Sequence, residues 1–285
     1  MSTYDQKLQK LIREALNEDV GDGDHSTLSS IPAGKRGKAV LKIKQDGILA
    51  GLDVAEIIFK TVEPGAIFTK YKKDGEKMLF GEKAFDVEAD IQTILTCERL
   101  VLNIMQRMSG IATLTNQYIQ IIKGYNTKIL DTRKTTPNFR LLEKEAVKIG
   151  GGQNHRFGLY DMIMLKDNHI DFAGGIENAI NNAWNYVQTK KLGLQIEVET
   201  RTLEDVKKVI LMGEGKVVRI MLDNFSIEQI REAVKLIEGK FETEASGGIN
   251  LENIIEYAKT GVDYISIGAL IHQAKSLDLS LKAAL

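Results

Sequence analysis

The stretch that decides the fold runs from Met162 to Val187 and reads MIMLKDNHIDFAGGIENAINNAWNYV. It begins with an apolar run, continues through a polar turn, and ends in a segment with the apolar spacing of a helix. The same order of apolar strand, polar loop and amphipathic helix recurs from Thr127 onward. Alternation of this kind predicts a parallel sheet whose strands are joined by helices.

The number of strands favours a closed β/α barrel. The expected strands are KIL (128–130), MIML (162–165), LQIEVE (194–199), VVRIML (217–222), FETEAS (241–246) and YISIG (264–268). GQNHRF, at 152–157, is a candidate seventh strand. A doubly wound sheet also fits this rhythm, but no unit carries the GxGxxG motif of dinucleotide-binding sheets.

The first third of the chain has a different pattern. KAVLKIKQDGILAG, at 38–51, alternates like a half-buried strand, and residues 91–124 are helical with an expected break near Ser109–Gly110. We therefore expect an α/β protein with two domains. The first spans residues 1–112 as a small antiparallel sheet with helices, and the barrel spans residues 113–269.

Composition excludes several classes of protein. The chain has 285 residues and a net charge of −1, and it is 43% hydrophobic and 27% charged, which indicates a globular protein without general affinity for nucleic acid or anionic membranes. Cys97 is the single cysteine, so no internal disulfide forms. The sequence shows no apolar run long enough for a membrane span and no signal peptide, so we expect a cytoplasmic location.

Cations follow the earlier strands of the expected barrel. Arg133 and Lys134 come after KIL, His155 and Arg156 lie in GQNHRF, and Lys166 comes after MIML. Active sites of β/α barrels lie at the carboxyl ends of the strands, and arginine grips carboxylate or phosphate through two hydrogen bonds. The pattern predicts a pocket for a small polyanion. The competing interpretation is that each cation pairs with an acid on a solvated surface.

Carboxylates and glycines follow the later strands. Glu197, Glu199 and Asp223 are candidate ligands of Mg²⁺, or alternatively members of a buried ion-pair network. The backbone N–H groups after the last two strands are candidate phosphate donors, unless these glycines serve only tight turns. Together the motifs predict a phosphorylated, magnesium-bound substrate beside a small carboxylic acid.

Long motifs carry a resemblance to a known family. The chain contains DTRKTTP, GGGQNHRFGLYDM, KDNHI, EVE, MLDNF, EASGGI and ISIGAL in this order, after EDVGDGDHST, DGILAG and ERLVLNIMQRMSGIAT. This set closely resembles quinolinate phosphoribosyltransferases, also called carboxylating nicotinate-nucleotide pyrophosphorylases, over nearly the whole chain. The resemblance implies an N-terminal α/β sandwich domain and an incomplete α/β barrel of about seven strands. Residues 270–285 are expected to return to the first domain.

The family's reaction joins quinolinate to phosphoribosyl pyrophosphate (PRPP) with Mg²⁺, giving nicotinate mononucleotide, CO2 and pyrophosphate in de novo NAD synthesis. The resemblance also implies homodimers, or larger assemblies of dimers, with each site shared between two subunits. It implies quinolinate ligands at Arg99 (from the partner subunit), Arg133, Lys134, His155, Arg156 and Lys166. Glu199 and Asp223 are implied at PRPP and the metal, with Glu197 nearby, and Ser246, Gly247, Gly248, Gly268 and Ala269 at phosphate. Lys134, Lys166, Glu199 and Asp223 are the candidate catalytic residues.

Three alternatives remain open at this point. A family member of the same fold, linked to molybdenum transport, would act on another acid. A Schiff-base aldolase would use Lys166 as a buried amine at a strand end. A non-catalytic binder of anions or nucleic acid is disfavoured by the near-zero net charge and by an aromatic content of 6%.

Overall fold

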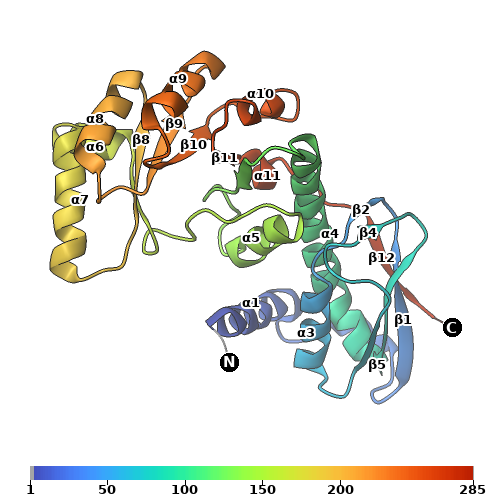
Figure 1. The fold of residues 1–285 in the computed structure, drawn as a ribbon. Coiled ribbons are helices and arrows are strands. Elements are labelled where there is room, and N and C mark those ends of the chain that lie inside the picture. Colours follow the sequence, from blue (N-terminus) through green and yellow to red (C-terminus); the bar gives the residue numbers. More distant parts are fainter. Residues whose placement is uncertain (1–2, 285) are drawn as a thin grey trace. The chain divides into compact units, whose positions relative to one another are not determined.

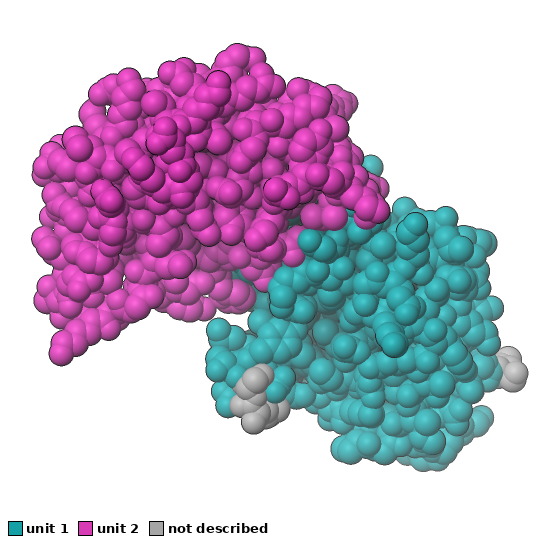
Figure 2. Space-filling model, viewed as in Figure 1, with its two compact units in different colours: residues 1–116, 135–151, 270–285 teal, residues 117–134, 152–269 magenta. Residues whose placement is uncertain are grey.

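The structure is a computed structural model that describes residues 3–284, and the chain divides into two compact units (Figure 2). Unit 1 comprises residues 1–116, 135–151 and 270–285, and unit 2 comprises residues 117–134 and 152–269. Residues 113–116 and 135–151 thus group with unit 1, whereas the sequence placed them in the barrel, and the expected domain limits stay a prediction. Among the described residues, no helix has both the length and the apolar character that a membrane span requires.

Unit 1 contains a four-stranded antiparallel sheet (Figure 1). Its strands, in spatial order, are β12 (Leu279–Ala283), β1 (Arg36–Ile43), β5 (Lys83–Asp90) and β3 (Ile67–Lys70). The short strands β2 (Gly47–Ile48) and β4 (Lys77–Met78) form a separate pair. In the core of this unit, the rings of Phe68 and Phe85 stack with centroids 4.3 Å apart, and Phe59 meets Phe85 edge-on. Because β12 pairs with β1, the end of the described chain is part of the first sheet.

One long helix contradicts a prediction. The helices of this part of the chain are α1 (Thr3–Val20), α2 (His25–Ser30), α3 (Leu52–Val62), α4 (Ile91–Ile121), α5 (Arg140–Ile149) and α11 (Ala269–His272). The expected break near Ser109–Gly110 is wrong, because α4 runs through both residues. The Ser109 hydroxyl accepts a hydrogen bond from the backbone N–H of Ala50. A Cβ at Gly110 would lie 2.0 Å from the carbonyl oxygen of Lys275, so glycine here permits a close approach of two backbones.

Unit 2 contains a six-stranded parallel sheet in the order β6-β11-β10-β9-β8-β7. The strands are β6 (Lys128–Leu130), β7 (Ile163–Leu165), β8 (Ile196–Thr200), β9 (Arg219–Asp223), β10 (Glu242–Ser246) and β11 (Tyr264–Ser266). The candidate seventh strand is reduced to an isolated parallel bridge between Gln153 and Leu130. The result is a mixed α/β fold whose second sheet has β6 and β7 at its two edges, so it is the incomplete barrel that the family resemblance implied and not the closed barrel that the strand count favoured.

Helices cover this sheet in chain order. They are α6 (Asp167–Ala173), α7 (Ile176–Lys190), α8 (Leu203–Gly213), α9 (Ile227–Ile237) and α10 (Ile254–Ala258), and each contacts the next (Figure 1). Capping boxes at Thr202 and Ser226 start α8 and α9, since each side chain accepts a backbone N–H of the first turn. Short βα connections of this kind bring all the strand carboxyl ends to one edge.

Candidate active site

Polar side chains gather where the parallel strands of unit 2 end. Asp223 ends β9 and lies in register with Ser246 of β10, which in turn pairs with Ser266 of β11. Asp131 follows β6 directly, and Lys166 follows β7. The residue pattern after the strands therefore predicted the edge of the sheet at which these groups meet.

Asp131 fixes the backbone that carries His155. Its side chain is fully buried, and Oδ1 accepts the backbone N–H of His155 at 2.9 Å. The other oxygen, Oδ2, accepts a hydrogen bond from the Asn154 amide nitrogen at 2.6 Å. A charged acceptor that satisfies two donors is a strong anchor. Asp131 thus holds residues 154–155 against the end of β6.

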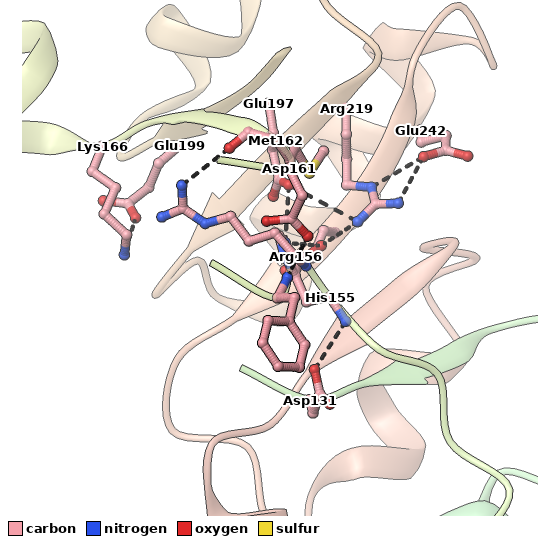
Figure 3. Close-up of polar contacts among 12 residues, drawn as sticks. Asp131, His155, Arg156, Asp161, Met162, Lys166, Glu197, Glu199, Arg219 and Glu242 are labelled. Carbon is pink, nitrogen blue, oxygen red and sulfur yellow. Dashed lines mark hydrogen bonds and ion pairs between the residues drawn. The ribbon is translucent and has the colours of Figure 1, made fainter. Parts of the chain in front are cut away.

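A buried cluster of charges lies inside the sheet (Figure 3). The Nε2 atom of His155 is 3.0 Å from the Glu197 carboxylate and 3.4 Å from that of Glu244. Arg219 Nη1 is 2.9 Å from Glu244, and Nη2 is 2.9 Å from Glu242. The side chains of Glu197 and Glu244 are 0% exposed, so the two cations offset carboxylates that have no water around them.

The cluster shifts the ionisation of its members. Burial alone would favour neutral His155, but hydrogen bonds to Glu197 and Glu244 outweigh it and raise the pKa of His155 to about 9. Burial, together with the charge of Glu244, raises the pKa of Glu197. For Glu244, burial is outweighed by His155 and Arg219, which lower its pKa. The folded cluster therefore holds a proton more tightly than the unfolded chain does.

The expected magnesium set is not brought together as one group. Among residues 3–284, the group of three metal-type ligands that meets is His155, Glu197 and Glu244, whose ligand atoms lie within 4.8 Å of one another. Glu199 and Asp223 are not part of it. The guanidinium of Arg219 contacts Glu244 directly and would repel a cation there. For Glu197 the structure favours the buried ion-pair network, which was the alternative to a metal ligand.

Two arginines, Arg133 and Arg156, lie close enough for the charge of Arg133 to act on Arg156. Burial and the charge of Arg133 lower the pKa of Arg156, because each factor disfavours a second positive charge. The Arg156 guanidinium donates to the carbonyl oxygen of Met162 at 3.3 Å. In the described chain, Nε of Arg133 is buried and has no hydrogen-bond partner. Such a pair is an incomplete anion site, because a bound carboxylate would satisfy the donor and relieve the repulsion.

Lys166 and Lys134 are both exposed. The Lys166 side chain is 47% exposed, and Nζ lies 3.3 Å from Oε2 of Glu199. The backbone N–H of Asp167 lies 3.4 Å from Oε1 of the same carboxylate. The description of Lys166 as a buried amine is therefore wrong. Lys134 lies in the loop after β6, where its backbone N–H donates to the Thr132 hydroxyl.

Asp223 and the glycines after β10 form a tight turn. Asn224, at φ 56°, donates through its side chain to Asp223 Oδ2 at 2.7 Å and through its backbone to the carbonyl oxygen of Ser246. Gly247 has φ 102°, and a Cβ there would lie 2.2 Å from Oδ1 of Asn224. Only glycine fits this position. Gly248 also has a positive φ, and Gly268 and Ala269 follow β11 half-buried.

Some functional residues lie elsewhere or were missed. Arg99 is an exposed residue of α4 in unit 1. Arg219 and Glu244 were not among the predicted site residues, although both are buried or nearly so beside His155. The available indication was a charged residue inside a strand that was expected to be buried, as Arg219 in VVRIML and Glu244 in FETEAS, because such a charge requires a partner.

Comparisons with known proteins indicate one family over nearly the whole chain. Family models described as "Quinolinate phosphoribosyl transferase, N-terminal domain" and "C-terminal domain" match residues 24–109 and 111–282. The chain is 45% identical to a quinolinate phosphoribosyltransferase [decarboxylating] of Nicotiana tabacum, covering 98% of this chain and 82% of that protein. It is 41% identical to a probable nicotinate-nucleotide pyrophosphorylase [carboxylating] of Bacillus subtilis, covering 98% and 94%. The crystal structure of NadC from Streptococcus pyogenes superposes with a TM-score of 0.91 at 39% identity, covering 100% of this chain and 99% of that one.

Proposed function

The chain belongs to the quinolinate phosphoribosyltransferase family, and we propose that it transfers the phosphoribosyl group of PRPP to quinolinate with loss of CO2. The products are nicotinate mononucleotide, CO2 and pyrophosphate, in the synthesis of NAD. The names of its relatives describe this chemistry in both directions, as decarboxylating transferase and carboxylating pyrophosphorylase.

The adjacent arginines are the observation that carries this proposal. Quinolinate has two neighbouring carboxylates, and Arg133 lies close enough to Arg156 for its charge to lower the pKa of Arg156. The buried Nε of Arg133 lacks a partner among the described residues, so it is a ready donor to a carboxylate. We assign Arg133 and Arg156 to the dicarboxylate, with Lys134 and Lys166 at its exposed side.

The carboxylates after β8 and β9 suit the sugar. In this reaction the pyridine nitrogen attacks the anomeric carbon while its bond to pyrophosphate breaks, so positive charge develops on the ribose ring. Glu199 and Asp223 are negative groups at the strand ends that would stabilise this charge. Lys166, which contacts Glu199, would lie between the dicarboxylate and the sugar.

Glu199 and Asp223 also fit a magnesium ion, because Mg²⁺ takes one or two carboxylates and completes its shell with water and phosphate oxygens. When bound, the ion would neutralise charge on the departing pyrophosphate. We leave Glu197 out of this proposed role, because it is buried beside His155 and Arg219.

Backbone N–H groups would hold the phosphate of PRPP. Ser246 and the positive-φ glycines Gly247 and Gly248 form a turn without side chains in the way. Gly268 and Ala269 follow the adjacent strand β11 and would add donors. The loops after the last strands of a barrel are a common phosphate site.

Loss of CO2 completes the reaction. Once the ring nitrogen carries the ribose, the ring is positively charged, and the bond to the adjacent carboxylate breaks to leave its electron pair on the ring carbon. The ring charge stabilises this ylide, and water supplies the proton that replaces CO2. The chain therefore needs to hold the dicarboxylate in place rather than supply a strong acid.

Assembly and location stay predictions. A homodimer would let Arg99, an exposed residue of α4, complete the site of the partner subunit, and larger assemblies of dimers would preserve it. The cytoplasmic location has no structural support, and the name of the Nicotiana tabacum relative describes that protein as mitochondrial.

The alternatives have less support. A Schiff-base lysine is kept neutral by removing it from water, whereas the side chain of Lys166 is 47% exposed and faces a carboxylate. An enzyme for another acid would still have to explain an arginine pair suited to two adjacent carboxylates.

The decisive experiment is an assay of purified protein with quinolinate, PRPP and Mg²⁺, with mass detection of nicotinate mononucleotide. A parallel tube holds nicotinate in place of quinolinate. Product from quinolinate alone supports the proposal. A folded protein that gives no product from quinolinate would exclude this function and direct the search to other aromatic acids.

A further inference from the structure

Asn224 has a backbone conformation that few residues adopt. It follows Asp223 directly at the carboxyl end of β9, and its φ of 56° lies in the left-handed region. Glycine is the usual residue in this region, and asparagine and aspartate are the side chains that tolerate it best. Asn224 is exposed, so packing in the core does not explain the choice of asparagine at this position.

The side chain of Asn224 contacts the carboxylate that precedes it. Its amide nitrogen, Nδ2, donates to Oδ2 of Asp223 at 2.7 Å. A hydrogen bond to an ionised acceptor is stronger than one between neutral groups, so this bond restricts the rotation of the Asp223 carboxylate. Asparagine combines the required φ with a neutral donor, whereas glycine has no donor and aspartate would repel Asp223.

The same residue contacts the glycine turn that follows β10. Asp223 and Ser246 are partners in the parallel ladder of β9 and β10, and the backbone N–H of Asn224 extends this ladder to the carbonyl oxygen of Ser246 at 2.8 Å. Oδ1 of Asn224 lies 2.2 Å from the position that a Cβ of Gly247 would take, so the amide packs directly against the turn. Asn224 therefore joins Asp223 to the turn through both its backbone and its side chain.

The far end of the turn is also held by an asparagine. Nδ2 of Asn253 donates to the carbonyl oxygen of Gly248 at 3.0 Å. Within the described part of the chain, the backbone N–H groups of Gly247 and Gly248 donate to no other residue. The turn is thus fixed through its carbonyl oxygens while its N–H groups stay available, which is the arrangement that an anion requires.

We infer that Asn224 is a positioning residue that joins the Asp223 carboxylate to the phosphate turn, so that Mg²⁺ and PRPP bind cooperatively. The inference rests on the proposed function, which assigns Mg²⁺ to Asp223 and a phosphate group to Gly247 and Gly248. A ligand that fixes one of these groups also favours the bound arrangement of the other, because Asn224 contacts both. Residues that orient a metal ligand in this way contribute to metal affinity without touching the ion.

Asn224→Gly removes the side chain alone, because glycine keeps the positive φ and the backbone N–H that bonds to Ser246. PRPP is titrated by calorimetry into the unchanged protein and the variant, each with and without Mg²⁺. Mg²⁺ should tighten PRPP binding to the unchanged protein, and this factor should fall by about tenfold in the variant. Without Mg²⁺ the two proteins should bind PRPP within about twofold of each other. Binding of Mg²⁺ to free PRPP is the same for both proteins and cancels in the comparison.

Glu238→Gly is the matched control for the change to glycine. Glu238 also has a positive φ, of 49°, and is exposed, but it follows the end of α9 instead of a strand. Its substitution should leave PRPP affinity within about twofold in both conditions. Asn224→Gly should likewise leave quinolinate affinity within about twofold, because Arg133 and Arg156 lie on other loops. A purely structural role would instead weaken quinolinate and PRPP binding alike, with or without Mg²⁺, and would overturn the inference.

A double-variant cycle separates positioning from direct contact with PRPP. If Asn224 acts through Asp223, Asn224→Gly should change the Mg²⁺ factor by less than about twofold once Asp223→Asn is present. If Asn224 were itself a ligand of PRPP, its penalty would be equal with and without Mg²⁺ and would add to that of Asp223→Asn. That second result would overturn the inference.

Asn224→Asp covers the case in which the glycine variant does not fold, because aspartate keeps the size of the side chain and tolerates a positive φ. Its carboxylate cannot donate to Asp223 and repels it, so the Mg²⁺ factor should fall here as well. A factor equal to or above that of the unchanged protein would overturn the inference, because the ion would then need charge at this position and not a donor.

The assay of the unchanged protein separates failure of this inference from failure of the proposed function. If that protein makes nicotinate mononucleotide, the function stands. The inference alone then falls if Mg²⁺ leaves PRPP affinity unchanged, or if the Mg²⁺ factor survives in Asn224→Gly. If the unchanged protein neither binds PRPP nor makes product, both proposals fall.

Discussion

Replacing Arg133 by alanine tests the anion site most directly. Nε of Arg133 is buried, has no hydrogen-bond partner among residues 3–284, and belongs to a guanidinium that lowers the pKa of Arg156. We expect Arg133→Ala to weaken quinolinate binding by about 2 to 5 kcal/mol, because a desolvated charge pair with the ligand is lost. At about 1.4 kcal/mol per factor of ten, this is a rise in Kd of roughly 30-fold to several thousand-fold.

The stability of the unliganded protein should respond differently. Substitution of a buried arginine usually destabilises a protein because a contact is lost, but Arg133 repels Arg156. Its removal should change the free energy of unfolding by less than about 1 kcal/mol, or increase it. Loss of binding together with unchanged stability is characteristic of a residue placed for a ligand at some cost to the fold.

The assay is calorimetric titration of quinolinate into the unchanged and substituted proteins, with urea unfolding of each. Arg133→Lys keeps the charge without the planar fork and should recover only part of the affinity. Arg201→Ala is the matched control, because Arg201 is 50% exposed and pairs with Asp171 at the surface of the same unit. A fall in affinity of less than about fivefold for Arg133→Ala, or a loss of several kcal/mol in stability, would refute the reasoning.

Three other perturbations have defined outcomes. The pKa of His155 is raised to about 9 in the folded state, so its protonation contributes about 3 kcal/mol to the free energy of unfolding below pH 6.5, and this contribution is lost as pH rises through 9. Urea unfolding between about pH 6 and 10 should show the loss, and His155→Gln should abolish this pH dependence. Glu143→Gln should cost about 3 to 5 kcal/mol by thermal unfolding, because the buried carboxylate pairs with Arg107 at 2.8 Å, and a cost under about 1 kcal/mol would show that the pair is not stabilising. Gly247→Ala should weaken PRPP binding by about tenfold or more, because its Cβ would lie 2.2 Å from Oδ1 of Asn224; unchanged PRPP affinity would exclude this turn from the phosphate site.

The sequence by itself determined the architecture of unit 2 and the edge that carries the site. Short apolar runs such as KIL and MIML became β6 and β7 at almost the expected residues, because burial on both faces of a parallel sheet favours continuous apolar segments. The polar residues that follow each run then had to lie at the carboxyl ends of the strands. This reasoning located Arg133, Arg156, Lys166 and Glu199 without any coordinates.

Tertiary structure decided which partners each polar residue contacts. Glu197 and Glu199 lie two apart on one strand, yet Glu197 is enclosed with His155 whereas Glu199 contacts Lys166. Their spacing is the same as in a pair of metal ligands, and only the neighbouring strands distinguish the two roles. The partners Arg219 and Glu244 come from separate segments, so no local pattern could join them to His155.

Helix α4 shows the same contrast between what local sequence predicts and what tertiary packing decides. Ser109 and Gly110 suggested a break in the helix by their low helical propensity, but α4 is continuous. The glycine is required because the chain near Lys275 passes against the helix, a contact between segments far apart in sequence. A glycine inside a helix costs about 1 kcal/mol relative to alanine, and tertiary packing outweighs this cost. The sequence therefore determined which segments are strands and helices, and long-range packing decided the environments in which their polar residues lie.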